Sequence, residues 1–118
     1  MLKVVDEGNF KDIIIGEGEM FLLPPNTPHN PVRFENTVGI VLEQARPKDS
    51  IDRLRWYCTN CHEVVDEASF HCVDLGSQIK EAVNSFKESG EERRKCKKCG
   101  VLAESAPRPG EIQDPNLK

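Results

Sequence analysis

GEMFLLPPNTPH, residues 18–29, places a histidine directly after a proline-rich loop, and places that loop directly after a short apolar run. Proline fixes its own φ and cannot donate a ladder hydrogen bond, so the four prolines of residues 24–31 mark a stiff loop between strands: Pro24, Pro25, Pro28 and Pro31. A stiff loop holds the His29 imidazole in one place, which is what a metal ligand requires. A lone histidine is more often an ordinary surface or core residue, and this pattern alone leaves both interpretations open.

Short apolar runs separated by turn residues surround this loop. They cover residues 2–5, 13–15, 20–23 and 38–42. Runs of this length and spacing predict antiparallel strands in a sandwich or barrel. A polar connector follows at 44–53, then a further predicted strand at 54–57 and short extended structure within 64–73. The sequence therefore predicts a mainly β protein.

Residues 77–89 form the one convincing helix of the sequence. Ser77 is the predicted N-cap and Gly90 the predicted stop, and the residues between them form one apolar stripe: Ile79, Ala82, Val83 and Phe86. The final residues, APRPGEIQDPNLK, are rich in proline and polar side chains, which predicts an extended or disordered tail.

Two Cys-x-x-Cys pairs, CTNC at 58–61 and CKKC at 96–99, are the strongest chemical signal in the chain. Four thiolates in this arrangement predict one tetrahedral metal site with a structural role, because a filled sulfur shell leaves no open position for catalysis. Either iron or zinc suits such a shell. We therefore expect His62 to lie on the surface of the site, and Cys72, the fifth cysteine, to be a small buried hydrophobe. The predicted ligands are Cys58, Cys61, Cys96 and Cys99.

Composition narrows the classes of function. A net charge of -4 and a pI near 5.4 argue against nucleic acid as the main partner. The basic residues at 93–98 are expected to offset the charge of metal-bound thiolates. A zinc ribbon that binds nucleic acid remains open as an alternative function of the four-cysteine region. No apolar run reaches the roughly 20 residues of a membrane span, and the start lacks signal-peptide features. We expect a cytoplasmic protein with reduced cysteines.

The spacing of Gly18, Pro24 and His29 resembles the second signature motif of the cupin superfamily, with Asn26 where that motif usually has glycine. Asparagine tolerates positive φ, so this departure is mild. The wider stretch EGEMFLLPPNTPHNPVRFENTVGIVLE, together with RLRWYCTNC and KCKKCG, resembles the 3-hydroxyanthranilate 3,4-dioxygenase family in its short single-cupin form. The resemblance implies part of a jelly-roll-like cupin barrel over residues 1–53 and a C-terminal four-cysteine region over 54–118.

The resemblance also implies a function and its site. Members of the family are non-haem Fe(II) extradiol dioxygenases and are often homodimers. They open the ring of 3-hydroxyanthranilate with O₂ and give 2-amino-3-carboxymuconate semialdehyde. This product is a precursor of quinolinate and NAD. His29 matches an iron ligand, Arg33 the clamp for the substrate carboxylate, and Glu43 the acidic group beside the substrate's amino and hydroxyl groups. Without the resemblance, Arg33 reads as a surface ion-pair partner and Glu43 as the end of a strand.

One part of the family pattern has no counterpart in these residues. The first cupin motif, which supplies a second histidine and an iron-binding glutamate, is absent, and the histidines other than His29 lie at 62 and 71. One imidazole does not hold Fe(II) against water, so we expect an N-terminally truncated, inactive form. The alternative is a non-catalytic cupin-like scaffold whose metal knuckle serves dimerisation or partner binding.

Overall fold

Five strands and two helices make up the regular structure of residues 1–104 and 111–116, which the computed structural model describes. The mainly β prediction is confirmed, and the strands are consistent with part of a cupin-like fold. The described residues cluster into two units, 1–43 with 111–116 and 44–104. The predicted division into domains at 1–53 and 54–118 stays a prediction.

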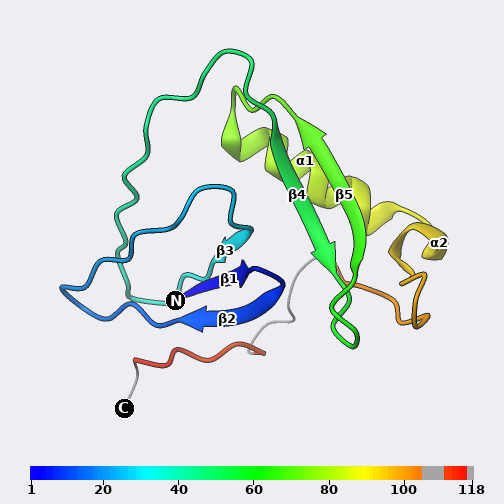
Figure 1. The fold of residues 1–118 in the computed structure, drawn as a ribbon, viewed down its shortest axis with the longest axis horizontal. Coiled ribbons are helices and arrows are strands. Elements are labelled where there is room, and N and C mark those ends of the chain that lie inside the picture. Colours follow the sequence, from blue (N-terminus) through cyan, green and yellow to red (C-terminus); the bar gives the residue numbers. More distant parts are fainter. Residues whose placement is uncertain (105–110, 117–118) are drawn as a thin grey trace. The chain divides into compact units, whose positions relative to one another are not determined.

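The first unit is built on a three-stranded antiparallel sheet with the order β2-β1-β3 (Figure 1). Its strands are β1 (Leu2–Asp6), β2 (Asn9–Ile13) and β3 (His29–Pro31). Glu7 and Gly8 both have positive φ, 49° and 81°, which is the backbone of a tight two-residue hairpin between β1 and β2. Alternate residues Leu2 and Val4 are buried on one face of β1. β1 thus forms the centre of the sheet.

Two predicted strands of the first unit are not strands. Residues 20–23 and 38–42 have no ladder partner in the described part of the chain. Their large apolar side chains are mostly exposed, up to 97% for Val38. The short apolar runs between turn residues predict strands here, but a strand exists only where a neighbour accepts and donates its main-chain hydrogen bonds. The predicted Pro24–Pro31 loop also differs, because its last three residues pair with β1 as β3.

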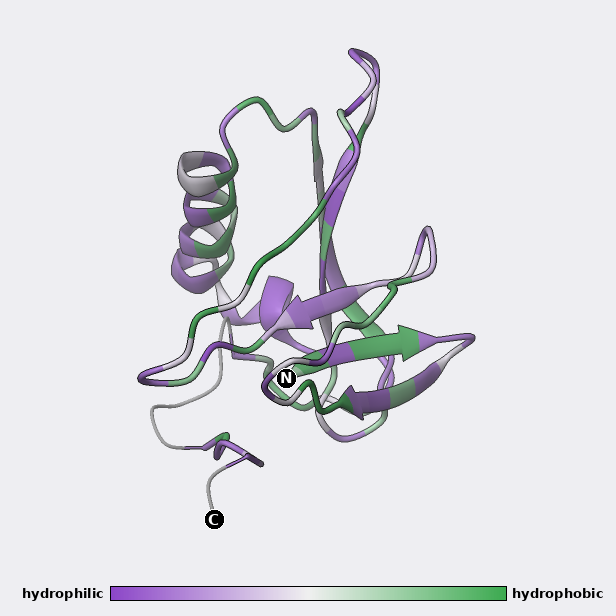
Figure 2. Cartoon of the chain, turned by 90° about the vertical axis from the view of Figure 1, so that its left-hand side faces the viewer, coloured by the Kyte–Doolittle hydropathy of each residue, from purple (hydrophilic) through white to green (hydrophobic). Residues whose placement is uncertain are grey.

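The second unit joins a β hairpin to a helix. β4 (Asp52–Tyr57) pairs antiparallel with β5 (Val64–Phe70), and α1 (Leu75–Glu88) follows. Trp56 of β4 stacks on Phe86 of α1 with ring centroids 4.2 Å apart and planes 13° apart. Phe86 is fully buried, and hydrophobic residues gather on one side of α1 (Figure 2). The predicted stripe of the helix is confirmed as the side that forms the core.

The helix boundaries differ from the prediction by two residues at the start and one at the end. Asp74, rather than Ser77, is the N-cap. The amide oxygen of Gln78 accepts hydrogen bonds from the main-chain N–H groups of Val73 and Asp74, at 2.6 and 2.8 Å, so the first turn is closed from within the helix. Ser89 is the C-cap of α1. The sequence predicts a single helix, whereas the structure has a second, short one, α2 (Glu91–Arg94).

The predicted extended tail falls partly on residues 105–110 and 117–118, which lie outside the described residues. Residues 111–116 contain a bend and a turn and no regular element. None of the helices in the described part of the chain combines the length and the apolar content that a membrane span requires.

Candidate metal centre and the proline-braced loop

The four predicted cysteine ligands come together in the second unit. Their sulfur atoms all lie within 4.8 Å of one another. The sulfurs of Cys58 and Cys99 are 3.4 Å apart, and those of Cys61 and Cys96 are 3.5 Å apart. Four thiolates bound at ~2.3 Å to a tetrahedral ion would be about 3.8 Å from one another. The donor set and its spacing therefore fit a four-sulfur metal site.

Both Cys-x-x-Cys turns have the same main-chain pattern. The N–H of Cys58 donates to the carbonyl of Glu63 at 2.8 Å, and the N–H of His62 donates back to the carbonyl of Cys58 at 2.9 Å. In the second turn the N–H of Cys96 donates to Val101 at 2.9 Å, and that of Gly100 donates to Cys96 at 2.8 Å. Each turn thus presents two sulfurs to one point. We call these the two knuckles, residues 58–63 and 96–101.

Main-chain donors lower the pKa of two of the four knuckle thiols, Cys96 and Cys99. The N–H of Val101, with the side chain of Asn60, lowers the pKa of the Cys99 thiol to about 6. The N–H of Cys99 lowers the pKa of the Cys96 thiol. For Cys61 the N–H of Glu63 lowers the pKa, but burial and the neighbouring thiols raise it to about 12. Four anions this close repel one another, so a cation that replaces the remaining protons stabilises the cluster.

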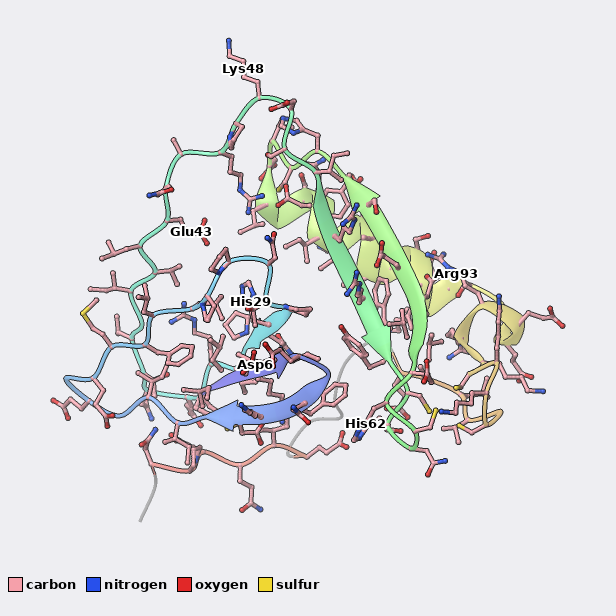
Figure 3. The ribbon with its side chains drawn as sticks, in the orientation of Figure 1. Asp6, His29, Glu43, Lys48, His62 and Arg93 are labelled. Carbon is pink, nitrogen blue, oxygen red and sulfur yellow. The ribbon has the colours of Figure 1, made fainter. Side chains whose placement is uncertain are left out.

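Each knuckle needs one residue in the left-handed region, directly after its second cysteine. Gly100 has φ +80° and His62 has φ +65°. Glycine adopts this backbone without strain, whereas other residues lose roughly 1 kcal/mol or more. His62 is exposed at the first knuckle (Figure 3), which agrees with its predicted surface position. Histidine is one of the residues enriched at such positions.

Gly100→Ala is therefore expected to lower the free energy of unfolding of the second unit by about 1–2 kcal/mol. A methyl group there would meet only Lys95 Cε at 3.6 Å, an ordinary contact, so the effect comes from the backbone. Gly90→Ala is the matched control, because Gly90 has φ -63° and open space around it. Urea unfolding followed by circular dichroism measures both. Equal stability of the two variants would contradict the assigned backbone strain.

The proline loop of the first unit holds His29 in a defined tautomer. His29 Nδ1 lies 2.9 Å from the carbonyl oxygen of Thr27. A carbonyl only accepts, so in the neutral imidazole Nδ1 carries the proton and Nε2 the lone pair. The pairing of Val4 with His29 between β1 and β3 fixes the backbone of the same residue. An exposed imidazole with a free Nε2 is arranged as a metal ligand is.

Asn26 has φ +56°, in the left-handed region. This positive φ agrees with the tolerance of asparagine for that region, on which the sequence analysis relied. Sequence reasoning did not identify the Thr27 carbonyl as the partner of the imidazole, because main-chain acceptors are the same for every residue type.

Arg33 and Glu43 also lie in the first unit, and both are exposed. Neither has a hydrogen bond or ion pair with another residue in the described ranges, and none joins them to His29. In the view of Figure 3, Glu43 is on the extended stretch after residue 38, with its carboxylate directed toward the side where His29 lies. Within residues 1–104 and 111–116, the one group of three or more potential metal ligands is the cysteine cluster, so His29 has no such partners there.

The basic residues near the second knuckle are partly paired. Arg93 Nε donates to Asp66 at 2.8 Å, and its guanidinium carbon is 5.8 Å from the Phe86 ring centre. Lys98 Nζ is 3.3 Å from the carboxylate of Glu63 and so links the two knuckles. These contacts give Arg93 and Lys98 structural roles within the second unit.

A comparison with family models and a comparison with individual proteins identify the same family. The family model described as 3-hydroxyanthranilic acid dioxygenase matches residues 1–87. Proteins named 3-hydroxyanthranilate 3,4-dioxygenase are similar to this chain: that of Neurospora crassa is 73% identical over 118 residues, and that of Podospora anserina 65% identical over 121. Both alignments cover 100% of this chain and 65% of the relative. That of Scheffersomyces stipitis is 63% identical over 106 residues, covering 90% of this chain and 62% of the relative. The chain thus spans about 65% of the length of the first two relatives.

Proposed function

Because this chain belongs to the 3-hydroxyanthranilic acid dioxygenase family, we propose that residues 1–43 carry part of a ring-cleaving dioxygenase site for 3-hydroxyanthranilate. The observation that carries the proposal is the family match over residues 1–87, which includes His29, Arg33 and Glu43. The proposed reaction adds O₂ to the substrate and gives 2-amino-3-carboxymuconate semialdehyde, a precursor of quinolinate and NAD.

Arg33 binds the substrate carboxylate in this proposal. The guanidinium is planar and offers paired N–H donors, which match the two oxygens of a carboxylate. Its lack of an ion-pair partner among the described residues supports this role, because a guanidinium already paired with a carboxylate would have to lose that partner first. Bidentate binding orients the aromatic ring as well as holding it.

Glu43 accepts a proton from the phenolic hydroxyl of the bound substrate. A carboxylate within hydrogen-bond reach is a general base suited to this step. The support for the role is the position of Glu43, exposed and without a hydrogen-bond or ion-pair partner in the described residues of its unit. The same carboxylate accepts a hydrogen bond from the neighbouring amino group of the substrate.

His29 Nε2 is one ligand of the proposed catalytic iron. An Fe(II) ion bound in such a site would supply the electron transfer that lets O₂ react with the ring. A facial triad requires two histidines and one carboxylate, and His29 is the one of these ligands that the described residues provide. The described residues alone therefore do not fit the iron, and the proposed roles of this chain are to bind and orient the substrate. The knuckle cluster holds a second, structural iron or zinc.

We also propose a cytoplasmic location and a homodimer. None of the five cysteines is in a disulfide, which is the state kept by a reducing compartment. Exposed apolar side chains of the first unit support self-association, because apolar surface in contact with water favours burial against a partner. These side chains belong to Met20, Leu22, Val38, Ile40 and Leu42.

Arg33→Leu tests the substrate site. We expect it to weaken binding of 3-hydroxyanthranilate by about 10- to 100-fold, the loss of a charge-assisted hydrogen bond pair. Isothermal titration of the 118-residue chain, with its iron and zinc content measured, gives the affinity. Arg53→Leu is the control, because Arg53 is an exposed arginine of the second unit.

Other outcomes would favour the other interpretations. One sulfur-bound metal with no affinity for 3-hydroxyanthranilate would support the non-catalytic scaffold. Binding of DNA or RNA that weakens steeply with salt would support the zinc-ribbon interpretation. Steady ring cleavage by the purified 118 residues, seen as absorbance of the product, would show that these residues hold a working iron site after all.

A further inference from the structure

The chain reverses direction between Arg33 and Gly39. Residues 35 and 36 form a turn, and Asn36 has φ +59°. The hydroxyl of Thr37 donates to the carbonyl of Phe34 at 2.6 Å and so closes the reversal. The two arms of the turn therefore run back past each other, and Gly39 lies against the side chain of Arg33.

The guanidinium of Arg33 occupies the space that a side chain at position 39 would need. A Cβ built on Gly39 would lie 3.0 Å from Arg33 Cζ and 3.6 Å from Nη2, and would overlap Nη1. A normal contact for a Cβ is about 3.5–4 Å. The guanidinium thus packs directly on the main chain of Gly39, and any other residue there would displace it.

The backbone of Gly39 does not by itself require glycine. The glycines with positive φ in the described residues are Gly8, Gly18 and Gly100, and Gly39 is not among them. The displaced atoms would be the far end of a flexible, exposed side chain, which moves without disturbing the fold. The absence of a side chain at residue 39 therefore affects where the guanidinium lies, and affects stability little.

We propose that Gly39 is a positioning residue for the substrate clamp, Arg33. Because Gly39 has no side chain, the Arg33 guanidinium packs on its main chain and is held in the orientation that binds a carboxylate. We call this main-chain surface of Gly39 the seat. The inference rests on the proposed function of Arg33. A seated guanidinium loses less conformational freedom when it binds a ligand than a free one, so a fixed seat strengthens binding and selects for ligands that carry the carboxylate.

Gly39→Ala tests the seat in the 118-residue chain. We expect the affinity for 3-hydroxyanthranilate to fall by about tenfold, because the guanidinium keeps its charge but loses one of its two hydrogen bonds to the carboxylate. The affinity for 2-aminophenol, which lacks the carboxylate, is expected to stay unchanged. In the Arg33→Leu background Gly39→Ala should have no further effect, since the two residues act as a unit. Circular dichroism checks that the variant folds.

Gly16→Ala is the matched control. A Cβ at Gly16 would likewise meet the end of a flexible charged side chain, Glu19 Oε1 at 2.5 Å, but not Arg33. It should leave both affinities unchanged. If Arg33→Leu weakens binding and Gly39→Ala does not, the seat is refuted while the proposed clamp stands. If Arg33→Leu has no effect, or the chain does not bind 3-hydroxyanthranilate, the clamp and the seat are both refuted.

Discussion

Cys58→Ser is expected to abolish metal binding at the knuckles and to unfold the second unit. Cys58 is 1% exposed and lies 3.4 Å from the sulfur of Cys99. Structural zinc sites in small domains contribute roughly 10–16 kcal/mol of binding free energy, which exceeds the whole stability of many domains, about 5–15 kcal/mol. Elemental analysis of the purified variant measures the metal, and thermal unfolding followed by circular dichroism measures the stability.

Cys72→Ser is the control for this experiment. Cys72 is half-buried and outside the cluster, and its main-chain N–H, rather than its sulfur, donates to Asp52 at 3.2 Å. The control variant should keep its metal and lose no more than about 1 kcal/mol of stability. A Cys58→Ser variant that retained one metal ion per chain and the parental unfolding temperature would contradict a metal site at the knuckles.

Phe86→Ala is expected to lower the free energy of unfolding of the second unit by about 3–5 kcal/mol, because a fully buried aromatic side chain leaves a cavity when it is removed. The stack on Trp56, with centroids 4.2 Å apart, adds roughly 0.5–1.5 kcal/mol beyond the buried area. Urea unfolding followed by circular dichroism is the measurement, since the substitution would alter the fluorescence of Trp56 directly.

Leu75→Ala serves as the control on the same helix, because Leu75 is 56% exposed at the first position of α1. Its loss should change the stability by less than about 1 kcal/mol. If both variants lose the same free energy of unfolding, the pair of Trp56 and Phe86 is not the centre of the core. A metal content that stays constant in Phe86→Ala would show that core packing and the knuckles contribute separately.

The chemistry of the knuckles was predicted from the sequence, and the structure confirms that the four sulfurs come together. Each Cys-x-x-Cys turn is specified by the local sequence, because its two metal ligands lie within four residues of the chain. The helix stripe and the positive φ of Asn26 were predictable for the same reason. The roles of His29, Arg33 and Glu43 stay predictions from the family pattern.

The strands at 20–23 and 38–42 were predicted and are absent. A short apolar run between turn residues is a local signal, but pairing depends on a neighbour that the local sequence does not specify. The N-cap at Asp74 was missed because Gln78, four residues inside the helix, accepts the hydrogen bonds that decide where the first turn begins. Which groups form such a hydrogen bond depends on the folded geometry, so neither the composition nor the residue spacing predicts it.

The sequence by itself determined the cysteine ligand set, the stiff loop before His29 and the apolar side of α1, since each depends on residues close together in the chain. Only the tertiary structure decided that β1 pairs with β3 at His29, that the imidazole donates to Thr27, and that Gly39 lies under the Arg33 guanidinium. Those contacts depend on how the backbone turns and which strands pair. Such choices are made by the packing of the folded chain as a whole.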